Sequence, residues 1–537
     1  MPTVLELLRE RKNQELWEKC CGFINLTIEQ FMTIQRRLLL EQVELLKNCE
    51  LGRHIMQGAK PRSLEEFREK VPVTRYADYA PYLLEQREDV LPEKPMLWQH
   101  TSGRSSEFSY KWVPVTARMY RELGDAFMAL LLFASCTESG EVTLDEGDKF
   151  LYGLAPPPYA SGCWAHRVAD EDVFEFLPSI EKAEGMGFEK RVEEGFRLGL
   201  IEGIDIMAAI SSMLVTIGER FGQGGGLKRA ASLLTKPRLM PRLLRAVVRS
   251  KLARRPMLPR DIWQLKALIS TGTDSVVYRE KIKDTWGRYP LDIYGATESV
   301  IIAMQAWDYA DMTFVPNLNL LEFMPLTEYA RWSADRAYRP KTLLLDEVIP
   351  GERYVILITN FLGGAFVRYI MGDIVRITSL RNERLNINLP QMAFYSRADG
   401  VLDFTYASFT EKVIWQAIES SGLTYVDWAA RKEIEESTPR LHIYIELKNM
   451  LKDEKEVIAA LDHQFKTAKE DYALMTEGFG YNLLKVTILP PGAFSQYIMK
   501  RRAAGSDLAH LKPPRINPTD EALAILLSSE QKSMTTV

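Results

Sequence analysis

Apolar residues recur three and four positions apart through most of the first ninety residues of the chain. The segment Leu26–Asn48 keeps this spacing over its whole length, which is the pattern of a helix with one buried face. We therefore expect residues 1 to about 90 to be helical, and we expect this helix to lie against a large domain. Residues Gly203–Phe221 show similar spacing and predict a further helix that ends at the glycines after it.

Strand-like and helix-like segments alternate in the middle of the chain. Lys149–Ala155 and Lys266–Thr271 are short, apolar and typical of buried strands. The second of these is followed by a helical pattern over Ser275–Gly287 and by another strand-like segment at Leu291–Tyr294. A strand, a helix and a strand of these lengths indicate parallel pairing.

The pattern changes after about residue 318, where short apolar segments follow one another with turn residues between them. Four segments read as strands: Leu318–Pro325, Thr342–Val348, Arg353–Thr359 and Asp373–Ser379. They predict an antiparallel, barrel-like subdomain attached to the parallel sheet.

A compact α+β pattern follows Ser396–Gly400. Its expected elements are a helix at Phe409–Gly422, a strand at Leu441–Lys448, a long helix at Asp453–Met475 and a strand at Lys485–Gly492, with a closing helix after them. We therefore predict an α/β protein with two domains. Residues 1–396 form a large domain, 397–400 a hinge, and 401–537 a smaller, mobile α+β domain.

Composition and charge narrow the class of protein. The chain has 537 residues, of which 46% are hydrophobic and 26% charged, and its net charge is −4. A folded core is expected, and nothing overall favours a nucleic acid or an anionic membrane as partner. The five cysteines form no Cys-x-x-Cys pair, which favours free thiols in a reducing compartment. The longest apolar run, Ala126–Cys136, is too short to span a bilayer, so we expect a soluble, cytoplasmic protein.

One basic stretch, Lys236–Pro256, stands out against this acidic background. Arg242, Arg245 and Arg249 can share one face of a helix, with leucines and valines on the others. A helix that binds a membrane or a nucleic acid is one interpretation. We favour a solvated amphipathic helix, because the rest of the chain is acidic.

The stretch His100–Thr116 gathers short hydroxyl side chains around Gly103, with Lys111 shortly after them. Hydroxyls and exposed backbone N–H groups hydrogen-bond phosphate oxygens in glycine-rich loops. The segment is therefore a candidate phosphate site. An ordinary Ser/Gly turn is the alternative.

The segment Tyr294–Ser299, with the sequence YGATES, directly follows a predicted strand. Ligands of open α/β sheets bind at the carboxyl ends of the strands. The face of Tyr294 can stack on adenine, Thr297 can donate to a phosphate, and Glu298 is an oxygen ligand suited to Mg²⁺. The alternative is a polar turn with a solvated glutamate.

Three further charged residues are candidates. Asp373 follows a glycine turn, and a carboxylate accepts from both hydroxyls of a ribose; a hairpin-closing aspartate is the alternative. Arg397 lies at the expected domain junction, where it could hold a ribose or a phosphate, unless the junction is a plain linker. Lys512 precedes two prolines and, taken alone, is a solvated surface lysine.

Together, and in this order, these segments resemble the adenylate-forming enzyme superfamily. They are most similar to its auxin-responsive branch, the acyl acid amido synthetases of plants and their bacterial relatives. The resemblance runs nearly end to end and includes TSGRSS with KWVP, LAPPPYASG, STG, YGATES, FVPNLNLLEF, RYIMGD and the ending from PPGAF to LKPPRI.

The resemblance implies which residues bind ATP. The phosphates would be lined by the glycine and hydroxyls of the first motif, namely Ser102, Gly103, Ser105 and Ser106. The adenylate would be contacted by residues of the second motif, namely Tyr294, Gly295 and Thr297. Asp373 would hold the ribose, with Arg397 beside it at the swivel of the mobile C-terminal domain.

The resemblance also implies an activity, with ATP and Mg²⁺ as cofactors. Glu298 would bind the Mg²⁺, and Thr297, Glu298 and Lys512 would act in catalysis, the lysine being brought by the C-terminal domain. The enzyme would be a ligase that activates a small carboxylic acid as an acyl-adenylate, releases pyrophosphate, and passes the acyl group to an amine such as an amino acid.

The first motif departs from the family pattern. Arg104 stands where a threonine is common, and Glu107 follows where a glycine is common. A carboxylate beside a triphosphate repels it unless it points away. Two alternatives therefore stay open: a ligase that forms a thioester with coenzyme A, and an inactive paralogue that binds a nucleotide. The acid, the acceptor and the oligomeric state are not set by the sequence.

Overall fold

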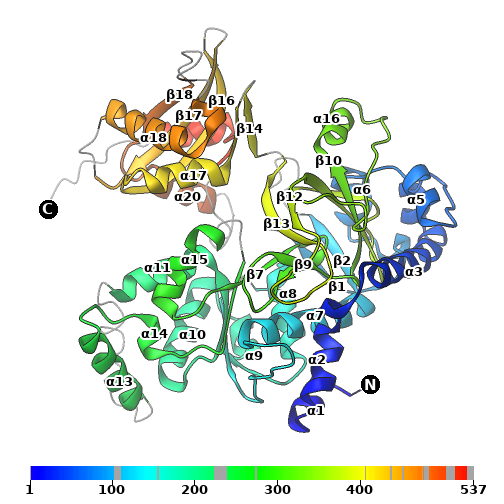
Figure 1. Ribbon diagram of the computed structural model, residues 1–537, viewed down its shortest axis with the longest axis horizontal. Helices are drawn as coiled ribbons and strands as arrows, with labels where there is room; N and C mark the ends of the chain where they lie inside the picture. The colour runs from blue at the N-terminus through cyan, green and yellow to red at the C-terminus, as the bar shows by residue number, and fades with distance from the viewer. Residues whose placement is uncertain are drawn as a thin grey trace. The chain divides into compact units, whose positions relative to one another are not determined.

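The structure is a computed structural model that describes residues 2–101, 111–153, 156–222, 239–271, 275–398, 400–404, 407–435, 438–449, 453–473, 476, 483–503 and 515–528. The chain divides into two compact units, Met1–Tyr395 and Ser396–Val537 (Figure 1). The sequence placed the domain boundary after residue 396. The mixed α/β class expected from the sequence is confirmed, with a larger first unit and a smaller second one.

An eleven-stranded mixed sheet forms the framework of the first unit, in the order β10-β11-β12-β13-β9-β8-β7-β6-β5-β3-β4. Its strands are β3 (Lys149–Gly153), β4 (Glu175–Leu177), β5 (Ile206–Ile210), β6 (Ala267–Thr271), β7 (Leu291–Ala296), β8 (Val300–Gln305), β9 (Met312–Phe314), β10 (Asn319–Pro325), β11 (Arg353–Asn360), β12 (Tyr369–Ser379) and β13 (Gln391–Arg397). Strands β3 to β7 pair in parallel, whereas the β7–β8, β8–β9, β9–β13, β10–β11 and β11–β12 pairs are antiparallel. The expected join of a parallel and an antiparallel part is confirmed.

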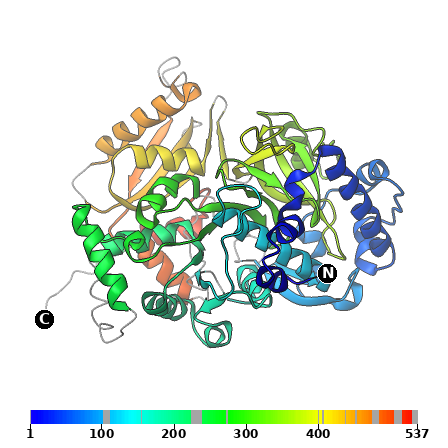
Figure 2. The same cartoon turned by 60° about the horizontal axis from the view of Figure 1, so that its bottom comes forward.

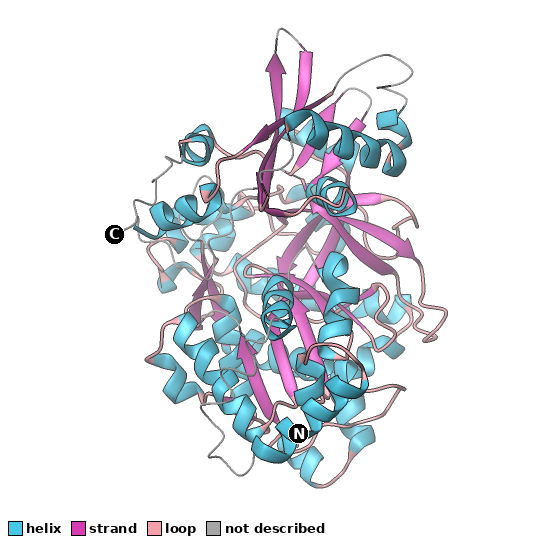
Figure 3. Cartoon of the chain, turned by 90° about the vertical axis from the view of Figure 1, so that its left-hand side faces the viewer, coloured by secondary structure: helices cyan, strands magenta, loops and turns pink. Residues whose placement is uncertain are grey.

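Helices cover both faces of the parallel strands (Figure 3). Successive side chains of a strand point to opposite faces, and these strands are apolar on both. Leu151, Met207 and Leu268 share one core cluster with residues of α10 (Phe188–Glu202), α11 (Ser211–Gly222) and α15 (Ser275–Trp286). Phe150, Ala208 and Ile269 instead face α7 (Ala117–Ser135) and α8 (Ala160–Ala169).

The chain begins with a series of helices, and the longest of them packs against the antiparallel part of the sheet (Figure 2). They are α1 (Val4–Arg9), α2 (Asn13–Cys21), α3 (Ile28–Lys47), α4 (Glu50–Ile55), α5 (Leu64–Lys70) and α6 (Tyr76–Leu83). The buried Gln35 of α3 donates to the carbonyls of Pro316 and Asn319, and Gln42 donates to that of Gly364. The predicted helical start and its place against the large domain are confirmed.

Three predicted elements are wrong in part. Gly203–Phe221 contains strand β5 before helix α11, because a short apolar run that is buried on both faces has no period that separates strand from helix. Thr342–Val348 is a loop with a single bridge to Phe323, since the Glu347 carboxylate accepts from the Leu344 N–H and closes a turn. The long helix at Asp453–Met475 is interrupted at the extended residue Lys469.

The second unit is α+β, as predicted. A three-stranded sheet of β16 (Tyr425–Glu435), β17 (Thr438–Leu447) and β18 (Leu484–Ile488) accompanies the hairpin of β14 (Val401–Phe404) and β15 (Ala407–Thr410). Its helices include α17 (Glu411–Ser420), α18 (Glu454–Ala468), α19 (Glu470–Ala473), α20 (Ala493–Ala503) and α21 (Asp520–Leu527). Strand β16 was not predicted. In the described parts of the two units, no helix combines the length and hydrophobicity that a bilayer crossing requires.

Candidate active site

A tight turn joins β7 to β8 at residues 297–299, and side-chain amides hold all three of its carbonyls. The donor and acceptor pairs are Gln99 to Thr297 at 2.9 Å, Asn360 to Glu298 at 3.0 Å and Asn319 to Ser299 at 2.8 Å. Asn319 and Asn360 lie on β10 and β11 of the large sheet, and Gln99 lies on β1 (Pro95–His100), which pairs with β2 (Trp112–Thr116) in a separate two-stranded sheet, so the turn is fixed from two sheets. Its side chains are thereby presented in one orientation at the carboxyl end of β7.

Gly295 allows this turn to form. A Cβ at this position would lie 1.9 Å from the carbonyl oxygen of Val300, so any larger residue would collide with the backbone. Val300 itself has a φ of 61°, an uncommon conformation for a β-branched residue. Strand β8 therefore begins with a residue that does not have regular strand geometry. Such local backbone strain is often found at functional sites.

The Glu298 carboxylate is held by a lysine and a tyrosine. Oε1 lies 3.1 Å from Nζ of Lys111 and accepts a hydrogen bond of 2.8 Å from the hydroxyl of Tyr369. The Glu298 side chain is only 8% exposed, and the lysine ammonium neutralises its charge. Burial and the negative charge of Glu298 both raise the pKa of Tyr369 well above its ordinary value, so Tyr369 stays a donor.

A second hydrogen bond joins the same two parts of the sheet. The hydroxyl of Tyr294, on β7, donates to Oδ2 of the buried Asp373, on β12, at 3.0 Å. The β11–β12 register shifts around residues 371–373, and Gly372 has a φ of 74° there. This bulge changes the direction of β12 and of the side chains that follow it. Strands β12 and β7 are not neighbours in the sheet, so the antiparallel part must curl to bring Asp373 to Tyr294.

Two polar groups of the turn are free of hydrogen bonds to the described residues, namely the Thr297 hydroxyl and Oε2 of Glu298. Mg²⁺ in phosphate-transfer sites is usually held by one or two carboxylates together with the phosphates of the substrate. A single carboxylate with one oxygen anchored and one available fits this pattern. Among the described residues, no cluster of three or more His, Cys, Asp or Glu side chains offers a metal site made by protein alone.

An apolar cavity lies beside the parallel strands, on the face covered by α7 and α8. Strands β3, β5, β6 and β7 contribute Phe150, Tyr152, Ala208, Ile269 and Ile293, and helices α7 and α8 contribute Phe127, Leu130, Leu131, Trp164 and Val168. Ile293 belongs to β7, the strand whose carboxyl end carries the turn. The hydroxyl of Tyr152 donates to the carbonyl of Ser161, and the buried indole N–H of Trp164 has no acceptor among the described residues.

The structure thus brings together several residues that the sequence singled out. Lys111 meets Glu298, and Tyr294 meets Asp373. Tyr294 reaches that carboxylate through its hydroxyl, whereas the sequence suggested a role for its ring face. The predicted phosphate-loop residues Ser102, Gly103, Ser105 and Ser106, with Arg104 and Glu107, lie outside the described residues, as do Lys512 and the side chain of Arg397.

Sequence reasoning missed the residues that support the turn. Tyr369 lies four positions before Asp373 in the RYIMGD segment, so its presence in that motif was the available signal. No signal in the sequence marked the three amide residues Gln99, Asn319 and Asn360, because a single amide in a strand is not distinctive. Each acts through a contact between segments far apart in the chain.

Profiles of the GH3 family match three parts of the chain. The N-terminal domain of the family matches residues 20–152, the central domain residues 312–397 and the C-terminal domain residues 409–521. Together these matches cover more than half of the sequence.

Two curated plant proteins are similar in sequence over part of their length. Jasmonoyl–L-amino acid synthetase JAR4 of Nicotiana attenuata is 28% identical over 225 residues, and indole-3-acetic acid-amido synthetase GH3.15 of Arabidopsis thaliana is 26% identical over 235. Each alignment covers 40% of this chain and 37% of the relative. The alignments therefore span well under half the length of these relatives.

Solved structures of adenylate-forming enzymes share the fold. The AtGH3.15 acyl acid amido synthetase in complex with 2,4-DB superposes with a TM-score of 0.66 at 16% identity, over 94% of this chain and 95% of that one. A 2-hydroxyisobutyryl-CoA ligase in the postadenylation state, in complex with 2-HIB-AMP, gives 0.60 at 15% identity, over 94% and 93%. At these identities the likeness is one of fold. From the three matching profiles and this fold, the chain belongs to the GH3 family.

Proposed function

We propose that this protein activates a small carboxylic acid with ATP as an acyl-adenylate and then transfers the acyl group to the amine of an amino acid. The observation that carries the proposal is a pair of buried carboxylates, Glu298 and Asp373, at the carboxyl end of β7. Lys111 and Tyr369 hold Glu298 in place, and Tyr294 holds Asp373. Ligands bind at this end of parallel strands. The names of the two curated relatives, a jasmonoyl–L-amino acid synthetase and an indole-3-acetic acid-amido synthetase, support an amine as acceptor.

Each group of the site has a task in the first half-reaction. Asp373 would accept from the ribose hydroxyls of ATP, and Thr297 would donate to the α-phosphate. Glu298 would hold Mg²⁺ through Oε2, while Lys111 and Tyr369 keep its other oxygen in place. The metal, when bound, screens the phosphate charge during attack by the acid's carboxylate. The protein contributes mainly positioning and neutralisation of charge.

The apolar cavity, about 30 Å³ in volume, would take a small apolar part of the acid. Its walls are almost entirely hydrocarbon, apart from the indole N–H of Trp164, so they favour an acid with a small apolar group. Because Ile293 of β7 lines the cavity, an acid with its apolar group in the cavity would extend along β7 and direct its carboxylate toward the turn. The expected site for the attack is beside Thr297.

The remaining predicted residues complete this proposal. Ser102, Gly103, Ser105 and Ser106 would line the phosphates, and residues 397–400 would let the second unit swivel. Arg397 would lie beside the ribose, and Lys512 would be delivered to the nucleotide for adenylation. All five cysteines are buried, free thiols, which fits a reducing compartment such as the cytoplasm.

Acid-dependent release of pyrophosphate tests the first half-reaction. The protein is incubated with ATP, Mg²⁺ and a panel of acids that ranges from short aliphatic to aromatic. Release with at least one apolar acid is expected, and none without acid. If no acid on a broad panel supports release while ATP still binds, the chain is a nucleotide-binding paralogue and the proposal is wrong.

A further inference from the structure

Helix α13 (Leu239–Leu252) is apolar on two opposite sides. One side is buried and consists of Leu239, Leu243, Ala246 and Ser250, which lie toward α10 and α14 (Pro259–Ile262) of the first unit. Arg242 adds to this attachment, because its guanidinium donates to the carbonyls of Leu200 and Ile201 at 2.8 and 3.0 Å. The helix is therefore fixed to the body of the unit by one side.

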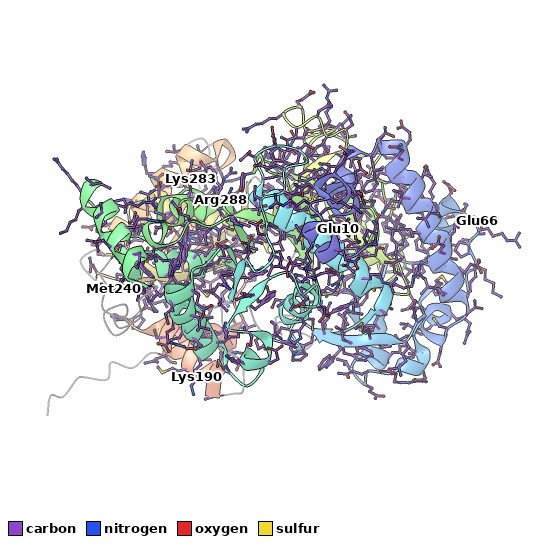
Figure 4. All side chains as sticks on the ribbon, turned by 90° about the horizontal axis from the view of Figure 1, so that it is seen from below. Glu10, Glu66, Lys190, Met240, Lys283 and Arg288 are labelled. Atoms are coloured by element: carbon purple, nitrogen blue, oxygen red, sulfur yellow. The ribbon has the colours of Figure 1, made fainter. Side chains whose placement is uncertain are left out.

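The other side exposes a row of large apolar side chains. Met240, Leu244, Val248 and Leu252 are 49%, 66%, 48% and 80% exposed. They are spaced four residues apart, so they follow one another along the helix surface. The helix lies at the periphery of the first unit, as the position of Met240 in Figure 4 shows. Single exposed leucines are ordinary, but a continuous row of four marks a surface for interaction.

Positive charge surrounds this row. From Leu239 to Arg260 the sequence contains seven basic residues and no acidic one, whereas the whole chain carries a net charge of −4. Arg255 is paired with Asp261 at 2.7 Å. Arg245, Lys251 and Arg254 are exposed and make no ion pair with any described residue. The surface thus joins exposed apolar side chains to unpaired cations.

We propose that α13 is a peripheral membrane-binding helix that docks on anionic lipid. Lipid headgroups with negative charge attract the three free cations, and the acyl region beneath them takes the row of apolar side chains. An anionic lipid surface therefore matches both the exposed cations and the row of apolar side chains. The attachment of α13 by its other side means that the helix is already formed before it meets the lipid.

Two other partners fit less well. A second copy of the chain would place the cations of one α13 against those of the other, and like charges repel. A nucleic acid would pair with the cations but would give no favourable contact to Leu244 and Leu252. Charge complementarity and apolar contact together select the lipid surface.

Vesicle binding by the full chain tests this inference. Binding to phosphatidylcholine vesicles that contain phosphatidylserine is expected to exceed binding to phosphatidylcholine alone, and to weaken as salt is raised. The variant Leu244→Ser/Leu252→Ser is expected to weaken it at least about tenfold. Replacing Arg245 and Arg254 by Gln is expected to weaken it about fivefold for each cation removed. The matched control is Leu84→Ser/Leu380→Ser, which removes two exposed leucines outside α13.

A label reports the contact directly. Because all five native cysteines are buried, an environment-sensitive dye should react selectively at Leu244→Cys, with Leu380→Cys as the control. The dye at position 244 alone is expected to shift to the blue with anionic vesicles. Equal binding to neutral and anionic vesicles, equal binding by the α13 and control variants, or self-association that the α13 variant abolishes would each overturn the inference. None of these assays depends on catalysis, so their outcome is separate from that of the proposed reaction.

Discussion

Replacement of Asp373 by alanine is the sharpest test of the nucleotide site. The carboxylate is buried on the β12 bulge, and one of its oxygens accepts from Tyr294 at 3.0 Å. A hydrogen bond to a charged acceptor contributes about 1.5–3 kcal/mol. A ribose offers two hydroxyls, but their contributions are not additive, so we count the loss of one bond. At 1.4 kcal/mol for each factor of ten, the Kd for ATP should rise about 10- to 150-fold.

Two milder substitutions separate the contributions. Asp373→Asn keeps the shape and an acceptor oxygen for Tyr294 but removes the charge, so its loss of affinity should be smaller than that of Asp373→Ala. Tyr294→Phe removes the donor and keeps the carboxylate, so it should weaken ATP binding least. The expected order of affinity is wild type, Tyr294→Phe, Asp373→Asn and Asp373→Ala.

Calorimetry with a non-hydrolysable ATP analogue measures these affinities. Asp308→Ala is the matched control, because Asp308 is a half-buried carboxylate of the same unit that accepts from Asn382 at 2.8 Å outside the site. Its affinity for the analogue should equal that of the wild type. If Asp373→Ala folds normally and binds the analogue as tightly as the wild type, Asp373 does not hold the ribose.

Three more outcomes are expected. Glu298→Gln keeps an acceptor for Tyr369 but removes the charge, so pyrophosphate release should fall at least about 100-fold with little change in Tm; a wild-type rate would exclude Glu298 as a metal ligand. Ala208→Phe fills the apolar cavity, so the KM for the acid should rise at least about tenfold while ATP binds normally; an unchanged KM would place the acid elsewhere. In the second unit, burial opposes ionisation of Glu433, but hydrogen bonds from Tyr444, His442 and Arg431 outweigh it and lower the pKa to about 2. As the pH falls, Glu433 is protonated in the unfolded chain before it is protonated in the folded one, so up to about 3 kcal/mol of stability present above pH ~4.5 should be lost as the pH falls toward 2. Thermal melts of Glu433→Gln should lack this acid-dependent loss. The same dependence of Tm on pH in the variant and the wild type would contradict the prediction.

The pattern of the sequence predicted those parts of the fold that depend on local order. Strand β6, helix α15 and strand β7 are where the apolar spacing placed them, and β7 ends in the turn that carries Thr297 and Glu298. Strand β5 was mistaken for helix because its apolar run is buried on both faces, so it has no alternation. Strand β16 was missed, since charged residues make up much of its second half.

Pairings between distant segments could not be read from the sequence. Lys111 and Glu298 are 187 positions apart, and Tyr294 and Asp373 are 79 apart. The second pair depends on the curl of the antiparallel strands and on a bulge at Gly372, and no spacing in the sequence encodes either feature. The motifs predicted candidate residues, while the sheet determines which of them touch.

Helix α13 shows a different limit of the sequence. The basic stretch around Arg245 was interpreted as a solvated amphipathic helix because the rest of the chain is acidic, but the sequence does not say which apolar face of the helix is covered. The structure buries Leu243 and exposes Leu244, its neighbour, which changes the interpretation of the whole helix.

Identification of the product by mass is the most direct test of the proposed reaction. The protein is incubated with ATP, Mg²⁺, an acid that supports pyrophosphate release, a mixture of amino acids, and coenzyme A. We expect AMP together with an N-acyl amino acid, whose mass is that of acid plus amino acid less one water. A thioester of coenzyme A as the sole acyl product would contradict the proposed transfer to an amine.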